Sequence, residues 1–106
     1  MITQDQIRSL TSDIVRNFNP DKIILFGSHA YGTPTAGSDA DLLVIMPFDM
    51  NPMEKMAEII YTVHPRIDID LLVRTPEMIA RRIDIGDPFM REIIAKGKVL
   101  YERADA

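Results

Sequence analysis

Four aspartates form two short pairs, and each pair stands where an apolar segment begins. Asp39 and Asp41 open the segment DADLLVIM, and Asp68 and Asp70 lie within RIDIDLLV. Successive side chains of a β-strand point to opposite faces, so residues two apart share a face. If the two segments are neighbouring strands, the four carboxylates therefore gather at one end of one face of a sheet.

Carboxylates gathered in this way need a counter-charge. Neighbouring strands lie only about 4.8 Å apart, and like charges at such distances raise one another's pKa and destabilise the fold. Mg²⁺ and Mn²⁺ are the natural partners, because hard divalent cations prefer oxygen ligands. Two such ions can hold both the attacking and the leaving oxygen of a phosphoryl displacement. The acidic pairs therefore predict metal-dependent chemistry at phosphorus.

A second motif supplies groups that could hold the phosphates. The apolar segment KIILFG ends at Gly27, and Ser28 follows directly. Glycine lets the backbone turn tightly and approach an anion closely. A helical turn that begins at Ser28 would present free N–H groups and the hydroxyl to a phosphate. We therefore expect Gly27 and Ser28 to bind the outer phosphates while the aspartates hold metals that bridge them.

The elements that must position these residues follow an irregular order of helices and strands. Apolar periodicity, capping residues and breakers predict helices at 3–18, 52–64, 76–86 and 87–97 and strands at 22–27, 39–46, 66–75 and 98–102. The segment 33–38, TPTAGS, reads as a loop. Along 52–64 the buried face is expected to comprise Met53, Met56, Ile60 and Val63. This order indicates an α+β fold, an α/β sandwich in which helices cover a small mixed β-sheet.

Length and composition limit the classes of protein that fit. The 106 residues, 46% of them hydrophobic, predict one domain over 1–106. There is no cysteine, which excludes disulfides and thiolate metal sites. No apolar run approaches the roughly 20 residues of a membrane span, and MITQDQIRSL lacks the pattern of a signal peptide. We therefore expect a cytoplasmic protein without a membrane partner. A net charge of -4 without a basic stripe argues against binding of long nucleic acid.

The stretch GSHAYGTPTAGSDAD has the form G-S, ten residues, D-x-D. It resembles the signature of the DNA polymerase beta-type nucleotidyltransferases. Within that superfamily the chain most resembles the minimal nucleotidyltransferase (MNT) domain proteins, and the similarity covers nearly its whole length. The LLV tails of the two acidic strands and the terminal GKVLYE are also similar to that family. The resemblance implies a mixed sheet with three catalytic carboxylates, two Mg²⁺ ions and transfer of a nucleoside monophosphate from a nucleoside triphosphate.

The resemblance also implies roles for individual residues. Asp39 and Asp41 match the paired metal ligands. The third carboxylate, a metal ligand and the base for the attacking hydroxyl, is Asp70 or Asp68; we favour Asp70 because its distance to the following T-P is usual in the family. Gly27 and Ser28 match the triphosphate-binding pair, and Ser38 is placed with them in the nucleotide site. His29 stands where the family often has arginine, so any hold it has on phosphate would be weaker and pH-dependent.

A partner protein is implied as well. The usual resemblance in the minimal family is to the antitoxin of a toxin–antitoxin pair, in which a helical HEPN toxin is adenylylated or sequestered. The leading expectation is therefore transfer of AMP from ATP to a hydroxyl of such a partner. Two alternatives stay open: a stand-alone nucleotidyltransferase that modifies a small molecule, and a catalytically idle binding partner.

Overall fold

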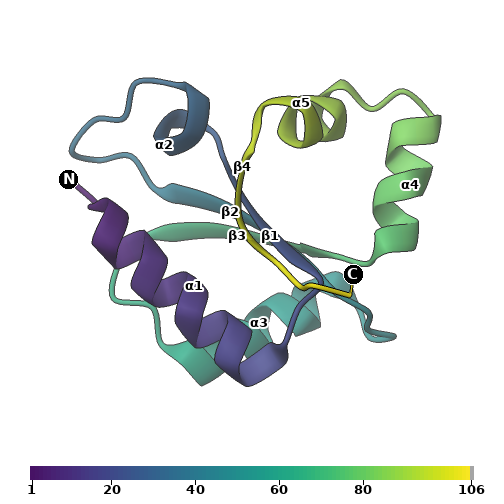
Figure 1. Ribbon diagram of the computed structural model, residues 1–106, viewed down its shortest axis with the longest axis horizontal. Coiled ribbons are helices and arrows are strands. Elements are labelled where there is room, and N and C mark those ends of the chain that lie inside the picture. Colours follow the sequence, from purple (N-terminus) through teal and green to yellow (C-terminus); the bar gives the residue numbers. More distant parts are fainter. Residues whose placement is uncertain (106) are drawn as a thin grey trace.

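The computed structural model describes residues 1–105 as one sheet with helices on both sides (Figure 1). Helices α1 and α3 lie on one side of the sheet, and α4 and α5 lie on the other. The elements, in chain order, are α1 Gln4–Phe18, β1 Lys22–Phe26, α2 Ser28–Tyr31, β2 Ala40–Ile45, α3 Pro52–Val63, β3 Ile69–Arg74, α4 Pro76–Asp84, α5 Pro88–Lys96 and β4 Lys98–Glu102.

The sheet is mixed, with strand order β3-β2-β1-β4. Strand β1 is antiparallel to both β2 and β4, whereas β2 and β3 run parallel. The chain returns from the end of β2 to the start of β3 through α3, the crossover that a parallel pair requires. The predicted α+β fold, with a small mixed sheet covered by helices, is confirmed.

Helix α1 shows how local sequence sets an element. The Thr3 hydroxyl accepts a hydrogen bond from the Gln6 backbone N–H at 3.1 Å, and the Gln6 side chain accepts one from the Thr3 N–H at 2.8 Å. This reciprocal pair satisfies two N–H groups that a helix start leaves free. The helix ends at Asn19, which adopts the left-handed conformation (φ 47°). Between these ends, Ile7 and Ile14 are fully buried against the sheet.

Each face of the sheet has its own apolar core. On the α1 and α3 side, Leu42 and Val44 of β2 pack with Ile23 of β1. On the α4 and α5 side, Leu43 and Ile45 of β2 pack with Met90 and Ile93 of α5. The central strands β1 and β2 are thus buried on both faces over most of their length, which explains the continuous apolar stretches IILF in β1 and LLVI in β2.

Two details differ from the sequence prediction. Strand β3 begins at Ile69 rather than at residue 66, because the chain joins the edge of β2 only where Ile69 pairs with Ala40. On α3 the fully buried residue is Ile59; of the expected face, Met56 and Val63 pack against the core, whereas Met53 is 66% exposed and Ile60 is 36% exposed. The contact face is therefore shifted toward Ile59, since α3 packs against both α1 and β3 rather than against the sheet alone.

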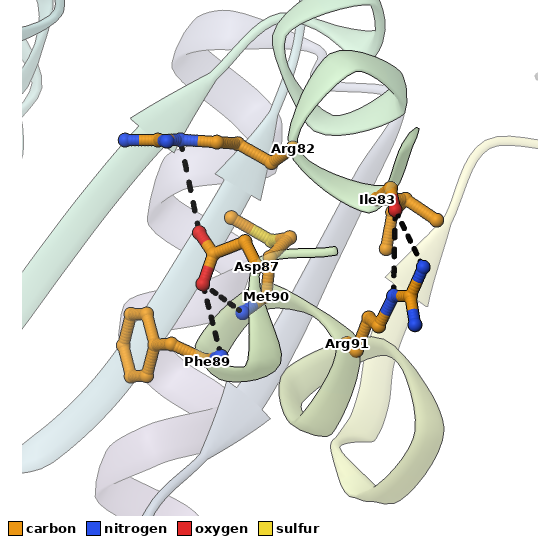
Figure 2. A network of polar contacts seen from close by, with 6 residues as sticks. All are labelled: Arg82, Ile83, Asp87, Phe89, Met90 and Arg91. Atoms are coloured by element: carbon orange, nitrogen blue, oxygen red, sulfur yellow. Dashed lines mark hydrogen bonds and ion pairs between the residues drawn. The ribbon is translucent and has the colours of Figure 1, made fainter. Parts of the chain in front are cut away.

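The corner between α4 and α5 is held by polar contacts (Figure 2). Asp87 caps α5 by accepting from the N–H groups of Phe89, at 3.0 Å, and Met90, at 3.4 Å, and it forms an ion pair with Arg82 at 3.7 Å. Arg91 of α5 donates to the carbonyl of Ile83 at 2.9 Å. These contacts fix the start of α5 relative to α4. None of the helices within residues 1–105 has the length and apolar character needed to cross a bilayer.

Candidate active site

The parallel strands β2 and β3 bring two of the predicted carboxylates side by side. Asp41 and Asp70 are direct partners in the register of the pair, so their Cα atoms are about 4.8 Å apart. Asp39 lies one residue before β2, on the side of the chain that Asp41 shares. Asp68 lies one residue before β3, and its carbonyl accepts from the Ala40 N–H at 3.0 Å. Register thus brings Asp41 and Asp70 together, while Asp39 and Asp68 lie one residue outside the same ends of these strands.

The carboxylates stand on the α4 and α5 side of the sheet. Leu43, two residues beyond Asp41, belongs to the core on that side, and Leu72, two residues beyond Asp70, packs against it. Alternation along the strands therefore places both carboxylates on this face, at the end where the apolar packing stops. Asp41 is half-buried there, whereas Asp39, Asp68 and Asp70 are exposed.

Gly27 ends β1 directly beside Asp41. Phe26, the last residue of β1, is the register partner of Asp41. Gly27 then adopts φ 73° and ψ -154°, a conformation open almost exclusively to glycine. A Cβ atom on Gly27 would lie 2.0 Å from Oδ2 of Asp41. Glycine is therefore required here for two reasons: only glycine adopts this backbone conformation readily, and the Asp41 carboxylate occupies the space that a Cβ atom would need.

The single turn of α2 follows and is tied to the start of β2. The Ala30 and Tyr31 N–H groups both bond to the Gly27 carbonyl at 3.0 Å, and Ser28 is half-buried at the start of the turn. The ring of His29 bonds through Nε2 to the carbonyl of Ser38 at 3.1 Å. Because a carbonyl only accepts, Nε2 carries the proton in this bond. The His29 ring therefore links the Gly27–Ser28 turn to the residue that precedes Asp39.

This link is a role that the sequence did not reveal. From sequence, His29 is a replacement for an arginine and a weak phosphate contact, because nothing local indicates that its ring reaches a backbone nine residues away. Ser38, predicted to be in the nucleotide site, accepts from the Thr35 N–H through its hydroxyl at 2.9 Å. Its side chain thus stabilises the loop that leads into β2.

Electrostatics single out Asp41 among the four acids. Its pKa is raised above the usual 3.8, first by burial, then by repulsion from Asp70 and from Asp39; the nearby His29 acts in the opposite direction. A carboxylate in this position is stabilised by any added cation. The charge on Asp41 is thus opposed by its surroundings, as expected at a site that binds a charged ligand.

The donor set suits Mg²⁺, but the side chains are not drawn together around one point. Within residues 1–105, no three His, Asp or Glu side chains are close enough to hold an ion as they stand. The acids nevertheless offer only oxygen donors, which hard cations prefer, and their mutual repulsion at Asp41 is the kind that a cation relieves. The residues therefore fit a divalent cation by chemistry and by charge.

Three of the four carboxylates, those of Asp39, Asp68 and Asp70, are exposed at the surface. A groove of about 580 Å³ lies elsewhere, between α1 and the segment after α3, and is lined by residues that include Gln6, Asp13, His64 and Arg66. None of the four aspartates lines it. The exposed acids at this end of the sheet are thus separate from that groove.

Comparisons with known proteins agree with this geometry. Residues 9–106 match the family model described as polymerase beta, nucleotidyltransferase. Over 80 residues, the chain is 31% identical to a "putative protein adenylyltransferase" of Methanocaldococcus jannaschii, covering 76% of this chain and 77% of that protein.

Solved structures show the same fold. The crystal structure of a "putative nucleotidyltransferase" from Sulfolobus solfataricus has a TM-score of 0.66 at 18% identity, covering 93% of this chain and 79% of that one. A toxin–antitoxin structure with AMP-PNP has a TM-score of 0.56 at 19% identity, covering 92% and 75%. A structure of the toxin–antitoxin MntA-HpeT has a TM-score of 0.54 at 18% identity, covering 98% and 77%. Given the matched span, the mixed sheet and the paired acidic strands, the chain belongs to the polymerase beta nucleotidyltransferase family.

Proposed function

We propose that the protein transfers AMP from ATP to a hydroxyl of a separate protein, a helical HEPN-type toxin for which it is the cytoplasmic antitoxin. The observation that carries this proposal is the register of Asp41 with Asp70 beside the Gly27–Ser28 turn, in a chain of a nucleotidyltransferase family. A protein acceptor is supported by the relative named as a protein adenylyltransferase and by the toxin–antitoxin structures of the same fold.

The metal would be held by Asp39, Asp41 and Asp70. We propose two Mg²⁺ ions, with Mn²⁺ as a substitute, which when bound neutralise phosphate charge during the displacement. Asp70 is preferred over Asp68 as the third carboxylate for two reasons. It is the register partner of Asp41, and it is the first of the two acids whose charge raises the pKa of Asp41, whereas Asp68 is not among them.

The chain's own residues bind the nucleotide and receive the proton. Gly27 allows the triphosphate to approach the backbone beside Asp41, and Ser28 and Ser38 bind it from the adjoining turn and loop. The acceptor oxygen forms a bond to the α-phosphorus while the bond from that phosphorus to the pyrophosphate oxygen breaks. Asp70 takes the proton of the acceptor hydroxyl, and pyrophosphate leaves. One hydroxyl and one ATP thus give one AMP ester, one pyrophosphate and one proton.

A protein can reach this site because the carboxylates are exposed. Asp39 and Asp70 are both open to solvent on the described surface. A hydroxyl on a tyrosine, serine or threonine of a partner can therefore be presented from outside the chain. The charge of -4, without a basic stripe, makes a long nucleic acid a poor partner for the same surface.

The test uses ATP labelled in two positions. The protein is incubated with the product of its neighbouring gene, Mg²⁺ and either α-labelled or γ-labelled ATP. Transfer of AMP labels the neighbour from the α-position alone, with a mass gain of one or more AMP groups. The label is lost with EDTA and in the Asp39→Asn and Ser28→Ala variants. It is retained in Asp49→Asn, which removes a similarly exposed carboxylate beyond the opposite end of β2.

Three results would each contradict one part of the proposal: the group transferred, the acceptor, or the role of Asp39. Label from the γ-position would show phosphate transfer rather than nucleotide transfer. An unlabelled neighbour with rapid labelling of a small hydroxyl compound would replace the protein acceptor by a small molecule. Unchanged labelling in Asp39→Asn would remove this aspartate from the site.

A further inference from the structure

An exposed aromatic ring stands beside the strand that carries the Gly27 turn. Phe89, on the first turn of α5, is 52% exposed, although α5 buries Met90 and Ile93. Its ring meets the buried ring of Phe26 edge to face, with 5.8 Å between the ring centroids and 81° between the planes. Phe26 is the residue immediately before Gly27 and the register partner of Asp41. The ring of Phe89 therefore contacts the residue that lies opposite Asp41 in the strand register.

Phe89 and the carboxylates lie on the same side of the sheet. Phe26 belongs to the core on the α4 and α5 side, the side to which Asp41 and Asp70 also point. Figure 2 shows the ring of Phe89 extending away from α5 on the side of the Arg82 guanidinium rather than toward Arg91. A nucleotide with its phosphates at Gly27 and Asp41 thus has an aromatic surface beside it on the same face.

The position of Phe89 is fixed before any ligand arrives. Its backbone N–H is bound by Asp87 at 3.0 Å, and the other oxygen of Asp87 is paired with Arg82. Phe26 holds the ring from one direction and leaves about half of the side chain in solvent. A preorganised ring loses little freedom when a flat ligand stacks on it, which favours binding.

We propose that Phe89 stacks on the base of the nucleoside triphosphate held by Gly27, Ser28 and the aspartates. This inference rests on the proposed function and extends it to the nucleoside part of the substrate. Stacking on an aromatic side chain uses the π-face that every base has. A purine offers a larger face than a pyrimidine, so Phe89 favours ATP and GTP over CTP and UTP without reading the base edge.

The experiment separates base binding from phosphate binding. Calorimetry in Mg²⁺ measures the affinity of wild-type protein and variants for ATP and for inorganic tripolyphosphate, which has no base. Stacking worth 1–3 kcal/mol predicts that Phe89→Ala weakens ATP binding by about 5- to 140-fold. Tripolyphosphate affinity should stay the same. Phe89→Trp should bind ATP at least as tightly as the wild type, because tryptophan offers a larger face.

Two further variants serve as controls. Phe89→Ala could weaken ATP binding simply by loosening α5. Phe89→Leu controls for this, because leucine keeps an apolar contact with Phe26 but has no π-face, and it should lose ATP affinity as well. Tyr61→Ala removes an aromatic ring that is 79% exposed on α3, on the other side of the sheet, and should leave ATP affinity unchanged.

The failure of this inference differs from the failure of the proposed function. Wild-type protein that binds neither ATP nor tripolyphosphate would overturn both. Normal ATP binding by Phe89→Ala and Phe89→Leu would overturn the stacking role alone, and so would an equal loss of tripolyphosphate affinity. Unchanged ATP affinity with reduced labelling of the acceptor would assign the ring to the partner protein instead.

Discussion

Replacing Gly27 by alanine should destabilise the protein moderately and abolish nucleotide transfer in the fraction that stays folded. The two effects have separate causes. The backbone at φ 73° and ψ -154° is strained for any residue with a Cβ. Such strain costs on the order of 1–3 kcal/mol. The added Cβ also falls 2.0 Å from Oδ2 and 3.0 Å from Cγ of Asp41. That overlap can be relieved only if the carboxylate rotates away from the turn.

The size of the effect follows from the strain. A domain of this length has about 5–15 kcal/mol of unfolding free energy, so the variant should still fold. Each 1 kcal/mol lowers the melting temperature by about 4–8 °C, which gives a fall of about 4–24 °C. The overlap with Asp41 adds little to this fall, because the end of a half-exposed side chain can turn away. It removes activity instead, because the carboxylate leaves the place where the metal and phosphates would meet.

Two other glycines serve as controls for Gly27→Ala. Gly86 has φ +82° with no atom within 4 Å of an added Cβ, so Gly86→Ala measures the cost of a positive φ without a steric overlap. Gly37 has open space and no positive φ, so Gly37→Ala should be neutral or slightly stabilising. Thermal unfolding followed by circular dichroism, with labelling assays well below each midpoint, gives both quantities. A melting temperature for Gly27→Ala equal to that of Gly37→Ala would refute the strain, and full activity would show that the space beside the Asp41 carboxylate is not needed for transfer.

Three other expectations can be checked with the same protein. In EDTA, Asp41→Asn should be no less stable than the wild type. The pKa of Asp41 is raised above 3.8 in the folded state, so the folded protein binds this proton more tightly than the unfolded chain does. The wild type therefore loses stability as the pH rises from 3.8 through the folded-state pKa, and the variant, which has no proton to lose there, does not. Melting curves from pH 3 to pH 7 should show a gap in favour of the variant that opens with pH, and a large loss of stability in the variant would point to a structural role. ATP should bind more tightly in Mg²⁺ than in EDTA, because triphosphate completes the oxygen ligands of an ion that the acids bind weakly alone; equal affinities in calorimetry would exclude a bridging metal. His29→Ala should lower the unfolding free energy by about 0.5–1.5 kcal/mol, since it removes the bond to the Ser38 carbonyl, and an unchanged denaturation midpoint would show that the ring does not hold the turn.

The nature of the site can be predicted from sequence because its rules are local. Asp39 and Asp41 share a face of a strand whichever partner the strand finds, since side chains alternate along any extended chain. Gly27 before Ser28 marks a turn because only glycine reaches such backbone angles readily. Thr3 and Gln6 likewise define the start of α1 without reference to the rest of the fold.

The tertiary structure decides what depends on residues far apart in the chain. The resemblance favours Asp70 over Asp68 as the third carboxylate, but only the parallel register of β2 with β3 shows which of the two lies directly opposite Asp41, and that is Asp70. That register results from long-range packing of apolar side chains on both faces of β2. The buried face of α3 is set in the same way, since contact with both α1 and β3 selects Ile59 and leaves Met53 in solvent.

Phe89 and His29 are also residues whose role depends on long-range packing rather than on the local sequence. Both residue types are visible in the sequence, but a phenylalanine on an amphipathic helix reads as core until the packing of α5 leaves its ring half in solvent beside Phe26. His29 reaches the Ser38 carbonyl because the loop between β1 and β2 folds back on α2. Local sequence determines which groups can carry the chemistry, and the pairing of distant segments determines which of them meet, because register and helix rotation depend on contacts that no short stretch contains.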